Sequence, residues 1–521
     1  MSWIVLGEHD GRIRLISKSD VTGLLPKGSF LTVMDGETKH ILRVDESYQT
    51  EPYSPSPLIA ELDLGSIVQD MKTQNQILAY RVKDLSNRTD GLIDFIKPQL
   101  TGRRSNQEEV STAVSADKPG PRVFLASVYA NNNQILCDEA GAPITVSLPE
   151  DMFFHQIMIV GRTGLGKSVC TKYLSQYFVE HLKGAVLAIN VKDTDFLKMD
   201  KPSSGFSDWA SEWDAIRESP HGIDNFTVYY PALSEIPKEK GVDSSKFRKI
   251  TLSIGELEPE ALSGLLRNIT DVASQSLPNI FRYWKEEVAE KDNSKGNPSF
   301  QDFIQYFRNN GDAGATFSTK NSRGELSSVV LHKGTIGNLL RNFDYARDFF
   351  DNEGAKTLDA EDVLIRGKFS VINVAVEKGV DFGAMVLRDL LHKIVQAKSS
   401  KEYDCEILII IDEVHQFYNN ESSKEALDDL DTICRTGRSQ KIGVVFSSQT
   451  PSDIPRGLAN VINTKLFFNS DSFSAKNLGI QVDSEEMSSL SKGYAFCSVY
   501  GLPQVRLIKF PVACSGVFEK D

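Results

Sequence analysis

The segment 161–168 constrains the fold of this chain more than any other part of the sequence. It reads Gly-Arg-Thr-Gly-Leu-Gly-Lys-Ser, and it lies between the apolar run 156–160 and a segment of helical character, 169–178. A glycine-rich loop between a buried strand and a helix presents backbone amides and the positive end of the helix dipole to a phosphate group. We therefore expect an α/β domain built around a nucleotide-phosphate site.

The residues of this loop are the candidate contacts to ATP. In such a loop the lysine reaches the β- and γ-phosphates, and the hydroxyl group that follows it binds Mg²⁺. These roles fall to Lys167 and Ser168. The full set of expected nucleotide-binding residues is Gly161, Arg162, Thr163, Gly164, Leu165, Gly166, Lys167, Ser168 and Val169.

Acidic side chains follow a second apolar run, 407–411. Asp412 is expected to reach the magnesium ion through water, and Glu413 is the candidate base that activates the attacking water. A second carboxylate at this place favours hydrolysis of ATP over phosphate transfer to a small acceptor. The run 443–448 ends before Gln449, whose amide is expected near the γ-phosphate if this strand lies beside the strand of the loop.

Arg435 and Arg438 precede that strand, in the segment Cys-Arg-Thr-Gly-Arg-Ser-Gln-Lys. Either arginine is a candidate to reach a nucleotide bound by a neighbouring subunit and to stabilise charge in the transition state. The alternative for each is a solvated loop arginine. His155 and His415 have no partner at metal-ligand spacing, so we expect packed or hydrogen-bonded histidines rather than metal ligands.

The order of apolar runs predicts a parallel sheet covered on both faces. Continuous apolar strands alternate with amphipathic helices, the pattern of α/β domains. The expected strands are 156–160, 185–191, 369–376, 407–412, 443–448 and 464–468, and the expected helices include 172–183 and 382–398. Residues 258–350 break the alternation and predict a helical insertion, and 493–511 predicts a closing hairpin.

The N-terminal part has a different character. Short apolar runs separated by turn residues, with Asp35-Gly36 as a hairpin signal, predict a small β domain. Residues 101–122 contain few large apolar side chains and two prolines, so we expect a linker or long loop there.

Composition excludes several classes of protein. The 521 residues carry a formal net charge of −13, which speaks against a protein that coats nucleic acid without sequence preference. No apolar window approaches the length of a membrane-spanning helix, and the N-terminus lacks the apolar centre of a signal peptide, so we expect a cytoplasmic protein without a membrane partner. The six cysteines form no CxxC pair, which disfavours a zinc site or a disulfide framework.

The motifs together resemble the HerA/FtsK branch of P-loop ATPases, and most closely the HerA-type hexameric DNA translocases. The matching segments are PKGSFLTV, ILRVDESYQTEPYSPSPLIAELD, GRTGLGKS, LIIIDEVHQF, RTGRSQKIGVVFSSQTPSDIP and LSKGYAFCSV. The resemblance implies a RecA-like ATPase core with a helical insertion, preceded by a small N-terminal β-barrel of the HAS-barrel type. The expected divisions are a barrel at 1–100, a linker at 101–122, an ATPase domain at 123–511 with its insertion at 258–350, and a tail at 512–521.

The resemblance also implies roles and partners. Lys167 and Ser168 take the loop roles, Asp412 and Glu413 form the acidic pair, and Gln449 acts as the sensor of the γ-phosphate. Arg438 takes the role of an arginine near the γ-phosphate. The family assembles as a homo-hexamer, uses ATP and Mg²⁺, threads double-stranded DNA through its pore and works with a nuclease or another effector.

The chain departs from the family at three places. Relatives often carry an arginine–histidine pair before the loop strand, where the arginine acts across the subunit boundary, but here Phe154-His155 stands and no arginine occurs from 123 to 160. Asp193 or Asp195 is expected to replace a carboxylate found in a turn of the relatives, and Asn469 stands where FtsK-like relatives often carry arginine. The two vacant arginine positions make Arg435 and Arg438 more important.

Two functions of different class follow. The first is an ATP-driven helicase or translocase of double-stranded DNA that acts with a nuclease or other effector in DNA end processing, DNA repair or antiviral defence. The alternative is a nucleotide-controlled ring scaffold that assembles and regulates an effector enzyme without productive translocation. A metabolic kinase is disfavoured because nothing resembles a pocket for a small acceptor. An acidic exterior is compatible with a DNA motor, since a ring needs basic residues only where its pore meets phosphates.

Overall fold

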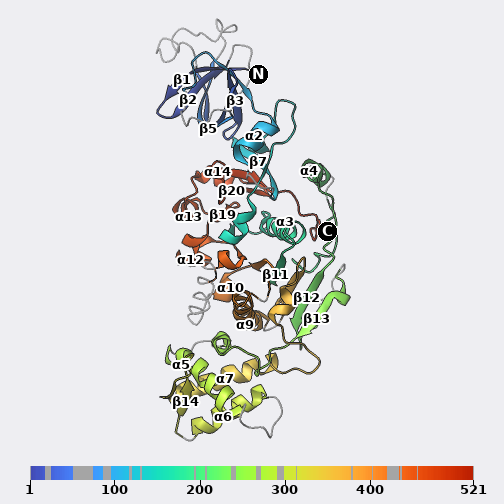
Figure 1. Ribbon diagram of the computed structural model, residues 1–521, viewed down its shortest axis with the longest axis vertical. Helices are drawn as coiled ribbons and strands as arrows, with labels where there is room; N and C mark the ends of the chain where they lie inside the picture. The colour runs from blue at the N-terminus through green and yellow to red at the C-terminus, as the bar shows by residue number, and fades with distance from the viewer. Residues whose placement is uncertain are drawn as a thin grey trace, which may run out of the picture.

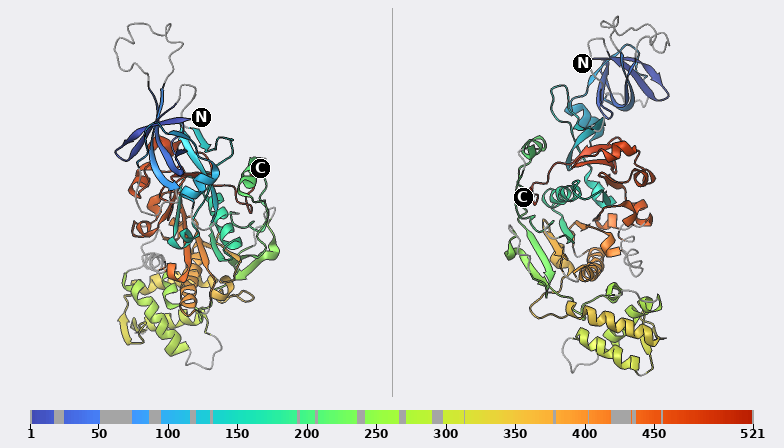
Figure 2. Two further views of the ribbon diagram at one scale, coloured as in Figure 1. Left: turned by 45° about the horizontal axis from the view of Figure 1, so that its top comes forward. Right: turned by 180° about the vertical axis from the view of Figure 1, so that it is seen from behind.

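The computed structural model is elongated and contains three successive parts along its long axis (Figure 1). A β-barrel, a wide mixed sheet flanked by helices, and a helical unit follow one another, and two further views show the same order (Figure 2). The structure describes residues 2–17, 25–50, 74–85, 95–115, 120–129, 132–192, 195–205, 208–235, 242–265, 271–289, 298–312, 314–376, 379–401, 403–418, 433, 437–454 and 456–519.

The N-terminal part is a closed barrel with the strand order β1-β2-β5-β4-β3-β6. Its alternating apolar side chains, among them Trp3, Ile13 and Leu31, fill the interior. The strands β3 and β4 pair across the predicted Asp35-Gly36 turn. The barrel strands are β1 (Trp3–His9), β2 (Arg12–Ser17), β3 (Phe30–Asp35), β4 (Thr38–Thr50), β5 (Gln74–Leu85) and β6 (Thr101–Arg104). The apolar run 58–64 predicts a further strand, which lies outside the described residues.

The segment 101–122 differs from the expected linker. Its first residues form β6, which closes the barrel, and α2 (Gln107–Val114) follows. Few apolar residues suffice here because a buried carboxylate holds the helix. Glu109 accepts hydrogen bonds from Arg103 (2.6 Å), Thr32 (2.8 Å) and Lys39 (3.1 Å). Asn106 and Glu109 also form a capping box at the start of the helix.

The middle part is a 13-stranded sheet with the order β13-β12-β16-β11-β17-β18-β10-β19-β20-β21-β7-β8, and β9 pairs with β7. From β13 to β19 the strands are parallel, and from β19 onward they are antiparallel. The parallel strands are β10 (Ile157–Val160), β11 (Ala185–Asn190), β12 (Phe226–Pro231), β13 (Phe247–Ile250), β16 (Phe369–Asn373), β17 (Ile407–Ile411), β18 (Ile442–Ser448) and β19 (Thr464–Phe467). The antiparallel ones are β7 (Arg122–Tyr129), β8 (Asn132–Ile135), β9 (Thr145–Ser147), β20 (Tyr494–Ser498) and β21 (Leu507–Lys509).

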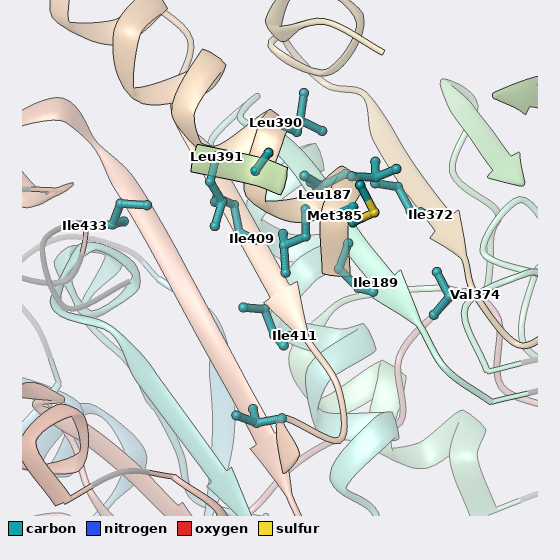
Figure 3. Packing of buried hydrophobic residues seen from close by; sticks show 14 of the residues in the cluster. Leu187, Ile189, Ile372, Val374, Met385, Leu390, Leu391, Ile409, Ile411 and Ile433 are labelled. Atoms are coloured by element: carbon teal, nitrogen blue, oxygen red, sulfur yellow. The ribbon is translucent and has the colours of Figure 1, made fainter. Parts of the chain in front are cut away.

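Successive residues of the central strands pack into two different cores. Ile409 and Ile411 belong to the core beneath α9 (Gly379–Ser399), whereas Leu408 and Ile410 belong to the core beneath α3 (Lys167–Glu180). Figure 3 shows Met385, Leu390 and Leu391 of α9 over the first of these cores. Burial on both faces explains why these strands read as continuous apolar runs, and it confirms the predicted α/β fold.

The sequence missed several elements of the core. The sequence analysis did not predict strands β12, β13 and β7. It also did not predict the helices α4 (Asp208–Ile216), α8 (Ala360–Val363), α10 (His415–Tyr418), α12 (Arg456–Val461), α13 (Ser472–Asn477) and α14 (Ser484–Ser488). Most of these are edge strands or helices of a few residues, whose period is too short to detect. Short 3₁₀ segments connect them at Glu150–His155, Ser244–Lys246, Arg347–Phe349 and Pro451–Asp453.

The insertion contains helices, as predicted, but also a hairpin. Its described elements are the 3₁₀ segment Pro259–Leu265, α5 (Asp271–Tyr283), a π-helical turn Trp284–Ala289, α6 (Phe300–Asp312), β14 (Thr316–Lys320), β15 (Leu326–Val330) and α7 (Lys333–Ala346). Phenylalanine rings form its interior, where Phe303 contacts Phe281 and Phe343. The insertion reaches the core through the edge-to-face pair Phe349–Phe382, in which Phe382 belongs to α9.

The last described residues pack against the nucleotide-loop helix α3. The Gly516 carbonyl accepts a hydrogen bond from Lys172 (2.8 Å), and the Ser515 amide donates to Gln176 (3.1 Å). Ala513 and Ser515 are fully buried. The segment expected as a tail is therefore part of the core as far as Val517. Within the described ranges, no helix combines the length and the apolar character needed to cross a bilayer.

Glu109 provides a test of the barrel. Burial acts to raise the pKa of its carboxyl group, but the bonds from Arg103, Thr32, Asn106 and Lys39 outweigh burial and lower the pKa from 4.5 to about 2. Because the folded-state pKa is depressed, this stabilisation is present above pH 4.5 and is lost as the pH falls toward 2. Glu109→Gln should lower the free energy of opening of barrel amides at pH 7 by about 3 kcal/mol in hydrogen exchange.

The neighbouring Glu108 is exposed and supplies the control, because Glu108→Gln removes the same charge without breaking this network. Equal protection of the Leu31 amide in both variants would contradict the assignment. The difference in melting temperature between wild type and Glu109→Gln should also shrink as the pH is lowered through this window.

Candidate functional site

Four neighbouring parallel strands deliver the predicted site residues to one edge of the sheet. The order β11-β17-β18-β10 places the loop 161–168 after β10, Gln449 after β18 and Asp412 after β17. Because β18 pairs with both β10 and β17, Gln449 follows the strand that lies between the loop and the acidic pair. This is the carboxyl edge of a parallel sheet, where α/β proteins bind their ligands.

Close backbone contacts shape the loop. A Cβ atom on Gly161 would lie 2.6 Å from the Cβ of Phe468, so only glycine fits. Gly166 has a φ of +104° and precedes the first residue of α3, Lys167. The amide of Arg162 donates to the carbonyl of Asn469 (3.0 Å), which places Asn469 beside the loop. The glycines therefore bring the backbone around the N-terminus of α3, as phosphate binding requires.

Lys167 folds back onto its own loop. Its ammonium group donates to the carbonyls of Gly161 and Arg162, the latter at 3.2 Å, and the residue is only 5% exposed. Burial and the nearby charge of Lys192 lower the pKa of Lys167. The lysine thus lies at the mouth of the loop, held by bonds that a phosphate oxygen can replace.

Asp412 and Glu413 are both buried, with exposures of 4% and 3%. Burial raises the pKa of Asp412, against the opposing charge of Lys192. Glu413 adopts a φ of +49°, which turns its backbone away from the strand direction. The Oε2 atom of Glu413 is buried without a hydrogen-bond partner within the described part of the chain. A buried carboxylate oxygen without a donor fits a group that accepts a proton from water.

Gln449 lies beside the candidate base. Its Nε2 atom donates to Oε1 of Glu413 at 3.5 Å. On the other side of Glu413, Nδ1 of His415 lies 3.5 Å from Oε2 and 3.8 Å from a carboxylate oxygen of Asp453. Ser448 donates to the same aspartate, and burial is outweighed there by hydrogen bonds that lower the pKa of Asp453. Nδ1 of His415 thus lies within 4 Å of two carboxylates.

The sequence analysis did not assign a role to Lys192. This residue follows β11 at the same edge, and its Nζ atom lies 3.0 Å from Asp412 and 3.1 Å from Glu413. The rule that carboxyl ends of parallel strands meet could have found it, since β11 pairs with β17. Asp195 is the next charged residue in this group and lies 3.1 Å from Lys172 and 3.9 Å from Lys192. Burial acts to raise the pKa of Asp195, but the charge of Lys172 and a hydrogen bond from Ser168 outweigh burial, so the pKa is lowered. Asp193 is outside the described residues.

Arg438 lies at the opposite edge of the sheet and not near its own loop. It precedes β18, and seven residues of strand at about 3.3 Å each separate it from Gln449. The ring of His155 stacks on the ring of Tyr500 with 3.5 Å between the ring centroids. Burial and the positive charge of Arg438 both lower the pKa of His155. Arg438 therefore lies away from the nucleotide loop of its own subunit, and its expected action on a nucleotide bound by a neighbouring subunit stays a prediction. Arg435 lies outside the described residues.

The residues of the carboxyl edge fit ATP and Mg²⁺. Lys167 and the N-terminus of α3 lie at the loop, where their positive charge can bind phosphate groups. The carboxylates of Asp412 and Asp195 and the hydroxyl group of Ser168 are oxygen ligands of the kind that magnesium prefers. The unpartnered oxygen of Glu413 completes the set. This arrangement can bind a nucleoside triphosphate and hold a water molecule beside its last phosphate.

Comparison with protein families gives the same assignment. Residues 135–378 match the family described as helicase HerA, central domain. The matched range begins before the loop strand and ends after β16, so it includes the loop, Lys192 and the whole insertion 258–350. The resemblance to the HerA/FtsK type of P-loop ATPase is thereby confirmed. No curated protein matches the chain.

Several solved structures match this chain at low sequence identity. The bacterial conjugative coupling protein TrwB, without its first 70 residues, has a TM-score of 0.46 and 14% identity, covering 79% of this chain and 94% of its own. VirB4 of Thermoanaerobacter pseudethanolicus has a TM-score of 0.46 and 11% identity, with coverages of 77% and 98%. TrwB in complex with ADP and Mg²⁺ has a TM-score of 0.44 and 14% identity, with coverages of 76% and 96%. At these values the strand order and the family match carry the fold assignment.

The loop geometry predicts the effect of one methyl group. Gly166→Ala places a Cβ 3.0 Å from the amide nitrogen of Gly493 at a φ of +104°, so the loop must distort. We expect nucleotide affinity to fall at least about tenfold, which corresponds to about 1.4 kcal/mol, in titration calorimetry with ATPγS. Gly457→Ala in α12 is the control, because its Cβ meets nothing within 4 Å. Unchanged affinity in the Gly166 variant would show that the nucleotide binds elsewhere.

Proposed function

Starting from the HerA-type P-loop ATPase core of this chain, we propose that the protein hydrolyses ATP at the carboxyl edge of its parallel sheet and uses the energy to translocate double-stranded DNA. In this proposal Lys167 and the loop 161–168 hold the phosphates, Ser168 and Asp412 hold Mg²⁺, and Glu413 accepts the proton of the attacking water. Gln449 orients that water from its place beside Glu413.

The observation that carries the proposal is the buried carboxylate of Glu413 next to Asp412, whose Oε2 atom accepts no hydrogen bond within the described part of the chain. Hydrolysis needs a base that accepts the proton of the attacking water, and the buried carboxylate of Glu413 is placed beside Asp412 to serve as that base. The bound magnesium ion supplies charge neutralisation of the phosphates. All other steps fall to side chains of this chain.

The position of Arg438 favours a ring. An arginine at the amino edge of the sheet cannot serve its own nucleotide, but it can serve a nucleotide at the carboxyl edge of a neighbour. We therefore propose a homo-hexamer in which Arg438 acts across the subunit boundary and replaces the arginine that relatives carry at the position of Phe154. Arg435, three residues earlier, is the second candidate for this role.

Double-stranded DNA is proposed to pass through the pore of this ring. The net charge of −13 argues that DNA meets a local basic surface and not the exterior as a whole. We propose that a nuclease or another effector docks on the ring, in DNA end processing or repair, or in antiviral defence, and that the complex works in the cytoplasm. We also propose that the barrel and the ATPase domain with its insertion are separate domains of the chain.

Substitutions at Lys167 and Glu413 should separate nucleotide binding from ATP hydrolysis. Lys167→Ala removes the charge that holds the phosphates, so ATPγS affinity should fall at least about tenfold. Glu413→Gln keeps the shape of the side chain but removes the base, so affinity should stay within about threefold while turnover falls by about 10²- to 10⁴-fold. Wild-type turnover in Glu413→Gln, measured by phosphate release, would refute the assignment of the base.

Mixed rings test Arg438. Arg438→Ala and Glu413→Gln each inactivate every site in a pure ring, but a mixture contains interfaces with an intact arginine and an intact base. Activity should therefore reappear on mixing if Arg438 acts across the boundary. Arg323→Ala, on the exposed turn between β14 and β15, is the control and should retain wild-type activity. Failure to regain activity at any mixing ratio would contradict action in trans.

The DNA motor and the ring scaffold differ in one measurement. A translocase should hydrolyse ATP several-fold faster when linear duplex DNA is added, and the increase should weaken with salt because phosphate contacts are screened. A hexamer whose turnover ignores duplex DNA, with and without its effector, would favour the scaffold. The salt dependence distinguishes phosphate contacts from an indirect effect of the partner.

A further inference from the structure

Lys192 lies where three buried or half-buried carboxylates converge. Its Nζ atom is 3.0 Å from Asp412, 3.1 Å from Glu413 and 3.9 Å from Asp195. The three acids follow the ends of two adjacent strands: Asp412 and Glu413 follow β17, and Asp195 follows β11. The ammonium group therefore bridges the two halves of the candidate metal and base site.

Charge balance explains why a lysine is needed there. Asp412 and Glu413 have exposures of 4% and 3%, and two buried carboxylates next to each other repel strongly unless a cation compensates them. The other lysines of the site have different partners: Lys167 bonds the carbonyls of its loop, and Lys172 bonds Asp195 and the carbonyl of Gly516. Lys192 is thus positioned to supply the charge that a divalent cation supplies in the loaded site.

We propose that Lys192 is an internal counter-cation that competes with the divalent metal for Asp412 and also pairs with the base Glu413, so that metal binds tightly only together with nucleotide. The inference rests on the proposed ATPase site. Without nucleotide, the ammonium group holds both carboxylates. When nucleotide enters, its phosphates offer the ammonium group a second partner. Asp412 then becomes free for the metal and Glu413 for the attacking water.

The geometry allows this exchange. The side chain of Lys192 is 37% exposed, although its charged end contacts groups that are 4% to 5% exposed, so the stem lies in the open part of the site. The four-carbon stem of a lysine side chain is flexible, so the ammonium group can move to another partner without a change in the backbone conformation. Lys192 thereby acts as a positioning residue: it sets when the acids are available and does not touch the bond that breaks.

The test measures metal binding without nucleotide. Mn²⁺ is the probe, followed by electron paramagnetic resonance on the full-length, nucleotide-free protein. Wild type should bind Mn²⁺ weakly, whereas Lys192→Met should bind it at least tenfold more tightly because the acid pair is left uncompensated. Lys249→Met removes an exposed charge on β13 and should behave as wild type. With saturating ATPγS, the Mn²⁺ affinities of wild type and Lys192→Met should agree within threefold.

Equal or weaker Mn²⁺ binding by nucleotide-free Lys192→Met would overturn the proposal. If that variant fails to fold, Lys192→Arg decides, since a guanidinium group grips carboxylates by paired hydrogen bonds and releases them less readily. That variant should bind Mn²⁺ together with ATPγS at least tenfold more weakly than wild type, and wild-type affinity would overturn the proposal. Neither measurement involves turnover or DNA, so its failure is distinct from failure of the ATPase or translocase assignment.

Discussion

The parallel register of β11, β17, β18 and β10 determines where every charged side chain of the site lies. Because their carboxyl ends share one edge, four loops that are far apart in sequence meet there and bring Lys167, Lys192, Asp412 and Gln449 together. The same register places Arg438 at the other edge, which makes a single subunit incomplete as a catalyst in our account. The fold and the need for a ring are thus two consequences of one constraint.

The energetic cost of this arrangement is buried charge. Asp412 and Glu413 are almost fully buried, and a packed protein interior tolerates such a pair only with compensation. Lys192 supplies it at 3.0 and 3.1 Å, and Lys172 compensates Asp195 on the adjoining side. A comparable device holds the barrel, where Glu109 is surrounded by Arg103, Lys39 and Thr32. In both places buried carboxylates are compensated by lysine or arginine side chains.

The sequence predicted the central strands, the loop and the acidic pair because each combines a buried apolar run with a chemical motif that needs a fixed place. It did not predict Lys192, since a lone lysine after a strand carries no motif and gains meaning only from its neighbour β17. Helix α2 was missed because its buried apolar residues are only Val110 and Val114, beside buried Glu109. The β14–β15 hairpin was missed because it is a short pair of strands within a helical segment. The edge occupied by Arg438 could be read only from the direction of β18 relative to β10.

The most direct test of the central claim is a cryo-electron microscopy structure of the full-length protein with ATPγS and Mg²⁺. The account predicts a ring in which the phosphates lie against residues 161–168, Lys167 has left the Gly161 carbonyl, and a neighbour's Arg438 approaches the γ-phosphate. A nucleotide bound away from this loop, or a loop occupied by nucleotide with no arginine arriving from an adjacent subunit, would contradict it.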